Sequence, residues 1–240
     1  MKKTIVSYLG VASALALFTP SAFAALAITN GDFETGGGDN VNDVTGWFDY
    51  STGGFWEGAW QTNNGGITPN GTNVVVISSF GATSDPFSGQ YLYQGIGTAD
   101  GASSVTIGFD FGAPNDDPGG RTLGMTVGIY AYDGVGTFAA GDGVSIYAAS
   151  QTAGSGVTLL SSNSDTQLVT TGVDGLIGSY EVTLGLSGAG AQQLFLGFNN
   201  YAPVGGDSWP VLDNIAIVPE PSAALLGGLG VLGLLRRRRR

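Results

Sequence analysis

The feature that most restricts the fold of this chain is a two-residue alternation of apolar residues with polar or small ones. It is strict from Val105 to Phe111 and from Leu123 to Ala131, and Leu194, Leu196 and Phe198 repeat it near the end. This period places one face of a strand in a core and the other toward solvent or a second layer. Further strands are expected over residues 73–79, 90–96, 144–149, 179–186 and 211–218. No stretch of the body carries a sustained amphipathic helical pattern.

Turn sequences rich in Gly and Asp separate these segments. Asn-Gly stands at 70–71, Asp-Gly at 133–134, 142–143 and 174–175, and Pro-Asn-Asp-Asp-Pro-Gly-Gly at 114–120. Many short strands divided by such turns predict an all-β fold, an antiparallel β-sandwich of the jelly-roll type. A right-handed β-solenoid is the alternative for a Gly-rich acidic chain, but the sequence has no repeat of fixed period.

The charges of the chain are strongly segregated. All of the 19 acidic residues except Glu220 lie within residues 25–217, where Arg121 is the only base. Such an acidic body repels nucleic acid and anionic membrane surfaces, so no nucleic-acid partner is expected, and it favours divalent cations. The chain has no Cys and cannot rely on disulfides, but residues 25–217 are long enough to form one domain with its own core.

The missing residue types narrow the chemistry that this body could perform. Without His or Cys there is no Ser-His-Asp triad, no Cys-His pair and no usual zinc ligand set. A pair of glycosidase carboxylates is the remaining catalytic option. Most of the aspartates stand in turn sequences, however, where the side chain caps its own backbone. We therefore expect no enzymatic activity and no catalytic residues, with a carboxylate-based glycosidase as the least favoured alternative.

Residues 1–24 have the layout of an export signal. Lys2 and Lys3 precede an apolar run from Ile5 to Phe18, and Ala22-Phe23-Ala24 forms a small-x-small cleavage site. A retained membrane anchor would need roughly 20 apolar residues. We expect a signal helix that is removed on export, which leaves a mature chain beginning at Ala25.

Aromatic residues gather in a Gly-rich stretch near the start of the body: Trp47, Phe48, Tyr50, Phe55, Trp56 and Trp60. Exposed flat rings suit stacking on sugar faces, whereas buried rings would close the end of a sandwich, and the sequence leaves both interpretations open. We expect Trp47 to be buried and one of Trp56 and Trp60 to be exposed. Tyr50, Trp56 and Trp60 are the candidate ligand-binding residues.

Three short motifs give the body a resemblance to galactose-binding-like jelly rolls, which include many carbohydrate-binding modules. They are Ile28-Thr-Asn-Gly-Asp-Phe-Glu34 with the later Gly46-Trp47, Tyr91-Leu-Tyr-Gln-Gly-Ile96, and Leu212-Asp-Asn-Ile215. The resemblance implies one structural calcium that joins the first strand to the last. Carried over, Glu34 and Asp213 become its side-chain ligands, and Gly31 or Asp32 offers a carbonyl.

Asp213 also stands out from the sequence alone. Strict alternation places it on one face with Val211, Ile215 and Ile217, where it is the polar exception. An inward carboxylate needs a partner, and no His or Lys is available. Calcium would satisfy it, and so would backbone N–H groups at a sheet edge.

The tail of the chain has three parts. Val218-Pro-Glu-Pro-Ser222 is followed by an apolar run and then by a cluster of arginines, Arg236, Arg237, Arg238, Arg239 and Arg240. This order resembles PEP-CTERM sorting signals, with Pro219, Glu220 and Pro221 as the sorting motif. The resemblance implies a bacterium with an outer membrane, in which an exosortase recognises and processes the tail during export. Proteins of this kind are often associated with exopolysaccharide and with biofilm formation.

Physical properties of the tail agree with such a signal. Two prolines keep the linker extended, because proline cannot join a ladder or a helix interior. The apolar run 223–235 would be about 20 Å long as a helix, which is short for a transmembrane helix in a hydrocarbon core of about 30 Å. The arginines would stay cytoplasmic and act as a stop. A basic tail for nucleic acid would leave the apolar run unexplained.

These observations predict a protein in three parts: a signal peptide at 1–24, a β-sandwich domain at 25–217 and a sorting signal at 218–240. It would pass through the inner membrane as an anchored precursor with transient membrane insertion. The mature form would lie at the cell surface or in the extracellular matrix. We expect it to bind exopolysaccharide, and the alternative is a purely structural or adhesive matrix protein without a sugar site.

Overall fold

The structure of the protein is a computed structural model that describes residues 26–36, 43–49, 58–62, 73–112, 122–164, 168–170, 177–203 and 206–219. The expected signal peptide and the sorting signal beyond Pro219 lie outside these ranges. In the part of the chain that is described, no helix is long and apolar enough to cross a membrane.

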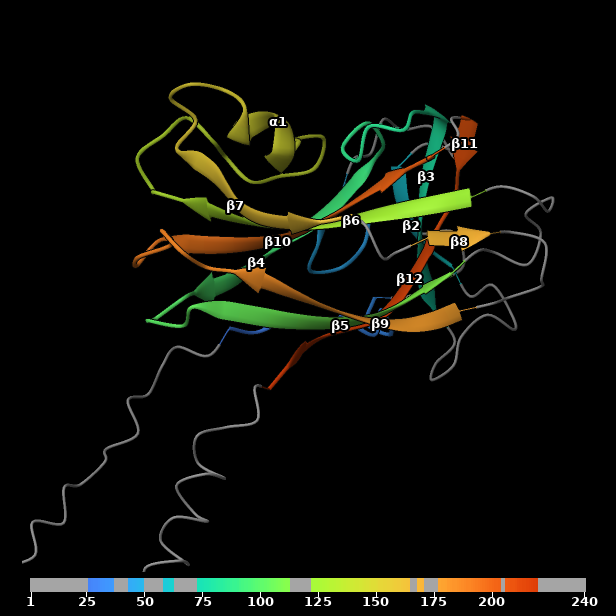
Figure 1. Cartoon of the computed structure of the whole chain (residues 1–240), viewed down its shortest axis with the longest axis horizontal. Helices are drawn as coiled ribbons and strands as arrows, with labels where there is room; N and C mark the ends of the chain where they lie inside the picture. Colours follow the sequence, from blue (N-terminus) through green and yellow to red (C-terminus); the bar gives the residue numbers. More distant parts are fainter. Residues whose placement is uncertain are drawn as a thin grey trace, which may run out of the picture.

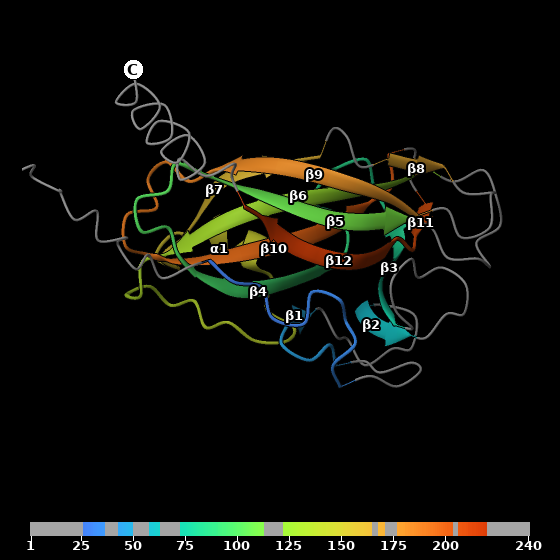
Figure 2. The same cartoon turned by 90° about the horizontal axis from the view of Figure 1, so that it is seen from below.

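The described residues form two antiparallel sheets packed face to face (Figure 1). The first sheet has the order β1 (Phe48–Asp49), β4 (Tyr91–Thr98), β10 (Gln193–Tyr201), β6 (Thr122–Tyr132) and β7 (Val157–Asn163), with β8 (Leu168–Thr170) paired to β6. The second has the order β11 (Gly206–Ser208), β3 (Val74–Ala82), β12 (Val211–Val218), β5 (Ser104–Gly112) and β9 (Ile177–Gly185), with β2 (Gly58–Thr62) paired to β3. The predicted antiparallel β-sandwich is confirmed (Figure 2).

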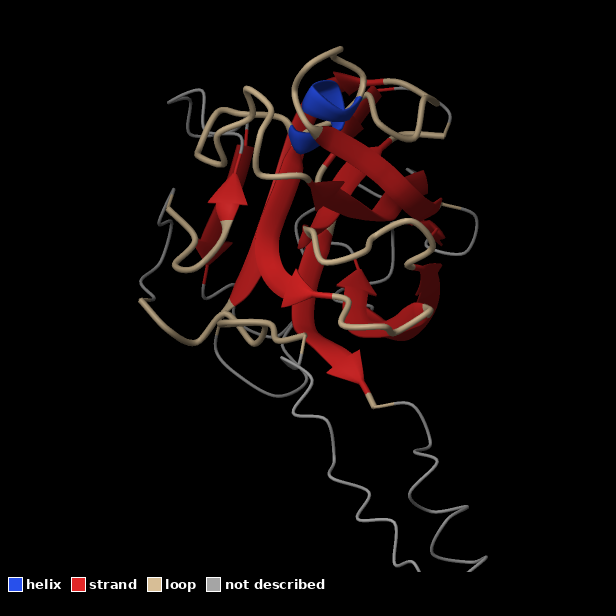
Figure 3. Cartoon of the chain, turned by 90° about the vertical axis from the view of Figure 1, so that its left-hand side faces the viewer, coloured by secondary structure: helices blue, strands red, loops and turns tan. Residues whose placement is uncertain are grey.

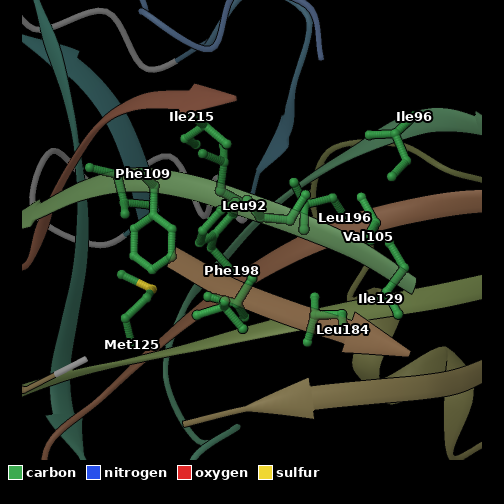
Figure 4. Packing of buried hydrophobic residues seen from close by; sticks show 14 of the residues in the cluster. Leu92, Ile96, Val105, Phe109, Met125, Ile129, Leu184, Leu196, Phe198 and Ile215 are labelled. Atoms are coloured by element: carbon green, nitrogen blue, oxygen red, sulfur yellow. The ribbon is translucent and has the colours of Figure 1, made fainter. Parts of the chain in front are cut away.

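The alternation seen in the sequence decides which side chains enter the main core. In β6, Leu123, Met125, Val127 and Ile129 are fully buried in the cluster between the sheets. Leu194, Leu196 and Phe198 of β10 and Ile107 and Phe109 of β5 join the same cluster (Figure 4). Removal of these side chains from water is the main force that holds the two sheets together.

A second apolar cluster includes the aromatic side chains of β4 and β6 that alternate with the core residues of these strands, together with part of the helix α1 (Ile146–Ser150). It contains Tyr91, Tyr93, Tyr130, Phe138, Ile146, Val157 and Phe195. The predicted strand at 144–149 is therefore wrong. The segment folds instead as the short helix α1 (Figure 3). Ser145 caps this helix by accepting a hydrogen bond from the Ala148 N–H, and Ile146 is the helix residue that is buried in the cluster.

Gln94 of β4 ties the N-terminal segment to the sandwich. Its Oε1 accepts the Thr29 N–H at 2.7 Å, and its Nε2 donates to the carbonyls of Thr29, at 2.9 Å, and of Gly46. The side chain is 4% exposed. These bonds satisfy polar backbone groups that would otherwise lack partners beside the core.

Replacing Gln94 by alanine is expected to lower the free energy of unfolding by about 2–3 kcal/mol, because three backbone groups lose their partner. Urea denaturation of the purified protein measures this change. Gln151→Ala, at an exposed position after α1, is the control and should change stability by less than about 0.5 kcal/mol. Equal losses in both variants would show that Gln94 does not hold the segment.

Candidate functional site

The N-terminal segment joins the closing strand β12 where that strand separates from β3. Strands β12 and β3 pair only at Val211 and Leu212. Beyond this point the Ile215 N–H donates to the Gly31 carbonyl at 2.8 Å. Gly31 lies so close to the strand that a Cβ atom there would stand 2.0 Å from the Ile215 carbonyl oxygen. The approach therefore requires glycine at position 31.

A β-bulge in β12 corrects the predicted face of Asp213. The register of β12 on β5 shifts between Asp213 and Ala216, and Asn214 has a positive φ of 50°. Leu212 and Ile215 are both in the main core, while Val211 belongs to a separate small cluster with Val74 and Val76. Strict alternation from 211 to 217 was a wrong assumption, since the extra residue of the bulge separates Asp213 from the face of Ile215.

Asp213 lies directly opposite another carboxylate. Its Cα partner on β5 is Asp110, and the two side chains are 1% and 6% exposed. Asn214 connects them: its Nδ2 donates to Asp110 at 2.8 Å and to Asp213 at 3.3 Å, and its N–H donates to Asp213 at 2.7 Å. Ser179 of β9 also donates to Asp110. Like charges opposite one another on neighbouring strands are unfavourable unless something neutralises them.

Burial raises the pKa of Asp213 to about 7, and the charges of Asp110, Glu34 and Asp32 add to this effect. The Asn214 N–H opposes the shift in pKa only in part. Glu34 and Asp32 thus lie near enough to Asp213 for their charges to act on it, and Gly31 lies against Ile215, two residues further along β12. The alternative interpretation was that backbone N–H groups at a sheet edge satisfy Asp213. Its carboxylate does accept the Asn214 N–H, but β12 lies inside the sheet and not at its edge.

Glu34 and Asp32 are exposed, in contrast to Asp213. The Glu34 carboxylate accepts hydrogen bonds from the backbone N–H of Asn73 at 2.9 Å and from its Nδ2 at 3.1 Å, just before β3. No group of three or more acidic side chains within the described ranges is arranged to hold a metal ion as it stands. A cation here would need carbonyl groups and water among its ligands.

The surface beside this carboxylate site is hollowed. An open pocket of about 500 Å³ is lined by Ile28, Asn30, Gly31, Asp32, Asn214 and Ile215. Sequence reasoning missed Asp110 and Asn214. The alternation of β5 could have indicated Asp110, because it puts this residue on the face away from Phe109 and Phe111. Asn214 could have been found only by anticipating the bulge in β12.

The aromatic residues fall into two groups. Trp47 is 3% exposed and packs against Phe33 and Phe198, so its predicted burial is confirmed. Trp60 lies in β2 with Val76 as its Cα partner. The side chain of Trp60, and Tyr50 and Trp56 as a whole, lie outside the described residues. Their connecting segment runs from β1, at an edge of the first sheet, to β2, which pairs with β3 in the second.

The final part of the chain matches a known sorting motif. The PEP-CTERM protein-sorting motif covers residues 218–240. This part of the chain is a PEP-CTERM sorting signal. Such a signal implies export, processing by an exosortase and sorting at a membrane. A comparison with curated protein sequences finds no match to the chain.

Solved structures with a similar fold come from proteins of low sequence identity. A cyclase from Fischerella sp. TAU in complex with 4-(1H-indol-3-yl)butan-2-one is 15% identical with a TM-score of 0.52, over 82% of this chain and 98% of the other. An apo cyclase from Fischerella sp. is 17% identical with a TM-score of 0.50, over 82% and 97%. The carbohydrate-binding module TmCBM61 in complex with β-1,4-galactotriose is 12% identical with a TM-score of 0.46, over 81% and 99%. At these identities the likeness to the two cyclases shows the β-sandwich fold and nothing further.

Proposed function

We propose that this PEP-CTERM protein is a non-enzymatic component of the cell surface or extracellular matrix, and that its β-sandwich binds exopolysaccharide. The sorting signal supports the location, since it directs the acidic domain out of the cytoplasm. Outside the cell a polysaccharide is an abundant ligand that needs no basic surface on the protein. The acidic character of residues 25–217 fits this better than an anionic partner.

The observation that carries the proposal is the order of the aromatic residues along the chain. Trp47 is buried in the main core, and Phe48 packs against the second apolar cluster. Tyr50 and Trp56 follow in the segment between β1 and β2, and Trp60 lies in β2, which has β3 as its neighbour in the second sheet. The sequence places four aromatic residues, Tyr50, Phe55, Trp56 and Trp60, in this connection and in β2, and aromatic rings exposed there would stack on successive sugar rings.

The proposed protein has no catalytic activity, because the two carboxylates with raised pKa values in the described part of the chain are buried. Burial raises the pKa of two carboxyl groups, Asp49 and Asp213, to about 7, which is the range that a general acid needs. Both side chains are 1% exposed, so a substrate would not reach them. This burial supports a structural role for both groups.

We further propose one structural calcium ion at the carboxylate site. The buried carboxylate of Asp213 and the exposed one of Glu34 would hold it, with carbonyl oxygens from Gly31 or Asp32 completing an all-oxygen ligand set. What supports this is the pair of opposed carboxylates, Asp213 and Asp110, in a described region that contains no Lys or Arg. The ion would stabilise the contact between the first segment and β12.

Replacing Trp56 or Trp60 by alanine is expected to weaken polysaccharide binding by at least about tenfold, which is about 1.4 kcal/mol for one stacked ring. Pull-down and affinity electrophoresis with purified exopolysaccharide measure the loss. Tyr147→Ala is the control. It removes a ring of α1 whose centroid lies 3.9 Å from that of the stacked Phe87 ring, and it should leave binding unchanged. If both tryptophan variants bind as well as the unchanged protein, the aromatic segment is not the sugar site.

A further inference from the structure

Asp49 is a buried carboxylate at the edge of the first sheet, whereas Asp213 lies on an internal strand of the second. It ends β1 in the first sheet, where its Cα pairs with Leu92 of β4. Its side chain is 1% exposed, and neither carboxylate oxygen has a hydrogen-bond partner among the residues that the structure describes. Leaving two buried carboxylate oxygens without partners is very unfavourable, so a cation or a proton must satisfy them.

The loop before α1 is held against the backbone of Asp49 by hydrogen bonds. The Gly143 N–H donates to the Asp49 carbonyl at 2.8 Å, and Asp142 Oδ1 accepts the Asp49 N–H at 3.3 Å. Gly141 exchanges hydrogen bonds with the Tyr93 hydroxyl, since its N–H donates at 3.0 Å and its carbonyl accepts at 3.1 Å. These bonds hold residues 141–143, and with them the Asp142 side chain, against the backbone of Asp49.

Negative charge accumulates around Asp49 with nothing in the described part of the chain to balance it. Burial raises the pKa of Asp49 to about 7, and the charges of Asp142 and Asp43 raise it further. The backbone N–H of Val44 lowers the pKa and opposes this shift only in part. The described residues contain no Lys, Arg or His, and the one base between residues 4 and 235 of the sequence is Arg121.

We propose that Asp49 and Asp142 form a second calcium site, which links β1 to the loop before α1. Asp49 supplies two fixed oxygens. Asp142 and Asp43 do not form a preformed metal cluster with it in the described structure, so their exposed carboxylates would turn toward the ion when it binds. A backbone carbonyl of this loop and water complete the six to eight oxygens that calcium takes. The site is separate from the one proposed at Asp213, and it fixes β1 at the residue before the segment that carries Tyr50 and Trp56.

Calorimetric titration of the purified protein with calcium chloride tests this site, with thermal unfolding as a second readout. Asp49→Asn is expected to abolish one binding event and the rise in Tm that accompanies it, and to fold normally in chelator because the amide is neutral and of the same shape. Asp142→Asn should weaken the same event by at least about tenfold, which is the loss that even a supporting residue of a metal site causes. Asp85→Asn, an exposed residue whose acceptor oxygen the amide retains, should change nothing.

The two calcium proposals can fail separately. A single binding event that is lost in Asp49→Asn and kept in Asp213→Asn supports the second site and removes the first. A single event that is kept in Asp49→Asn overturns the second site. Calcium binding that is absent altogether, with Asp49→Asn raising the Tm at pH 8, also overturns it and shows that Asp49 carries a proton.

Discussion

Replacing Trp47 by alanine is expected to lower the free energy of unfolding by about 3–5 kcal/mol, the usual loss when a large aromatic side chain is removed from a core. The Trp47 ring centroid lies 5.9 Å from that of Phe33 and 6.1 Å from that of Phe198. Its Nε1 also donates to the Asn30 carbonyl at 3.2 Å. One side chain thus joins the core to the segment that leads to Gly31. Urea denaturation at neutral pH in excess calcium measures the change.

Trp47→Phe is the matched control for this prediction. It keeps an aromatic ring in the core and loses the hydrogen bond and part of the volume, so it should lose clearly less stability than the alanine variant. If Trp47→Ala unfolds within about 1 kcal/mol of the unchanged protein, Trp47 does not pack as described.

In chelator, the free energy of unfolding is expected to fall as the pH rises from about 4 to about 7. The pKa of both Asp49 and Asp213 is raised from 3.8 to about 7 in the folded protein, in each case chiefly through burial. Between these values the folded state holds protons that the unfolded state has released, so each rise in pH favours unfolding. A change in pKa of this size corresponds to at most about 4 kcal/mol for each carboxylate. Urea denaturation across this pH range measures the slope.

The lack of histidine simplifies the interpretation of this pH dependence. The chain has no His, so no histidine titrates in the same window. Asp213→Asn should flatten about half of the slope, and excess calcium at pH 7 should restore stability, because the ion replaces the protons that the carboxylates lose. A stability that stays level from pH 4 to 7 in chelator would contradict the raised pKa values.

The sequence was sufficient to predict the sandwich because each of its main strands shows a local alternation of apolar residues with polar or small ones. Strands β5, β6 and β10 each have every second side chain in the main core, and this period is visible without any knowledge of partners. The segment 144–149 shows the limit of such reasoning. Its apolar residues fit a short strand as well as one turn of helix, and the capping bond of Ser145 decides between them.

The carboxylate site was only partly predictable, since its members come from three separate parts of the chain. Asp213 was evident as a polar residue in an apolar strand. Asp110 becomes its partner through the register of β12 on β5, which single-strand patterns do not contain. Asn214 enters the site through a left-handed backbone conformation at a bulge, a position that asparagine tolerates better than most residues.

The burial of Asp49 could not be predicted from the sequence either. Nothing in Gly-Trp-Phe-Asp-Tyr distinguishes it from the many aspartates of this chain that cap turns. Its burial depends on the loop before α1 folding over β1, almost a hundred positions later in the sequence. The sorting signal, in contrast, is a continuous motif and was recognisable in full.

Calorimetric titration of the purified protein with exopolysaccharide from the cells that produce it, in excess calcium, tests the central proposal most directly. We predict saturable binding that Trp56→Ala or Trp60→Ala weakens, while Tyr147→Ala leaves it unchanged. A protein that unfolds cooperatively in the same buffer, yet shows no saturable binding to this polysaccharide, would contradict the account.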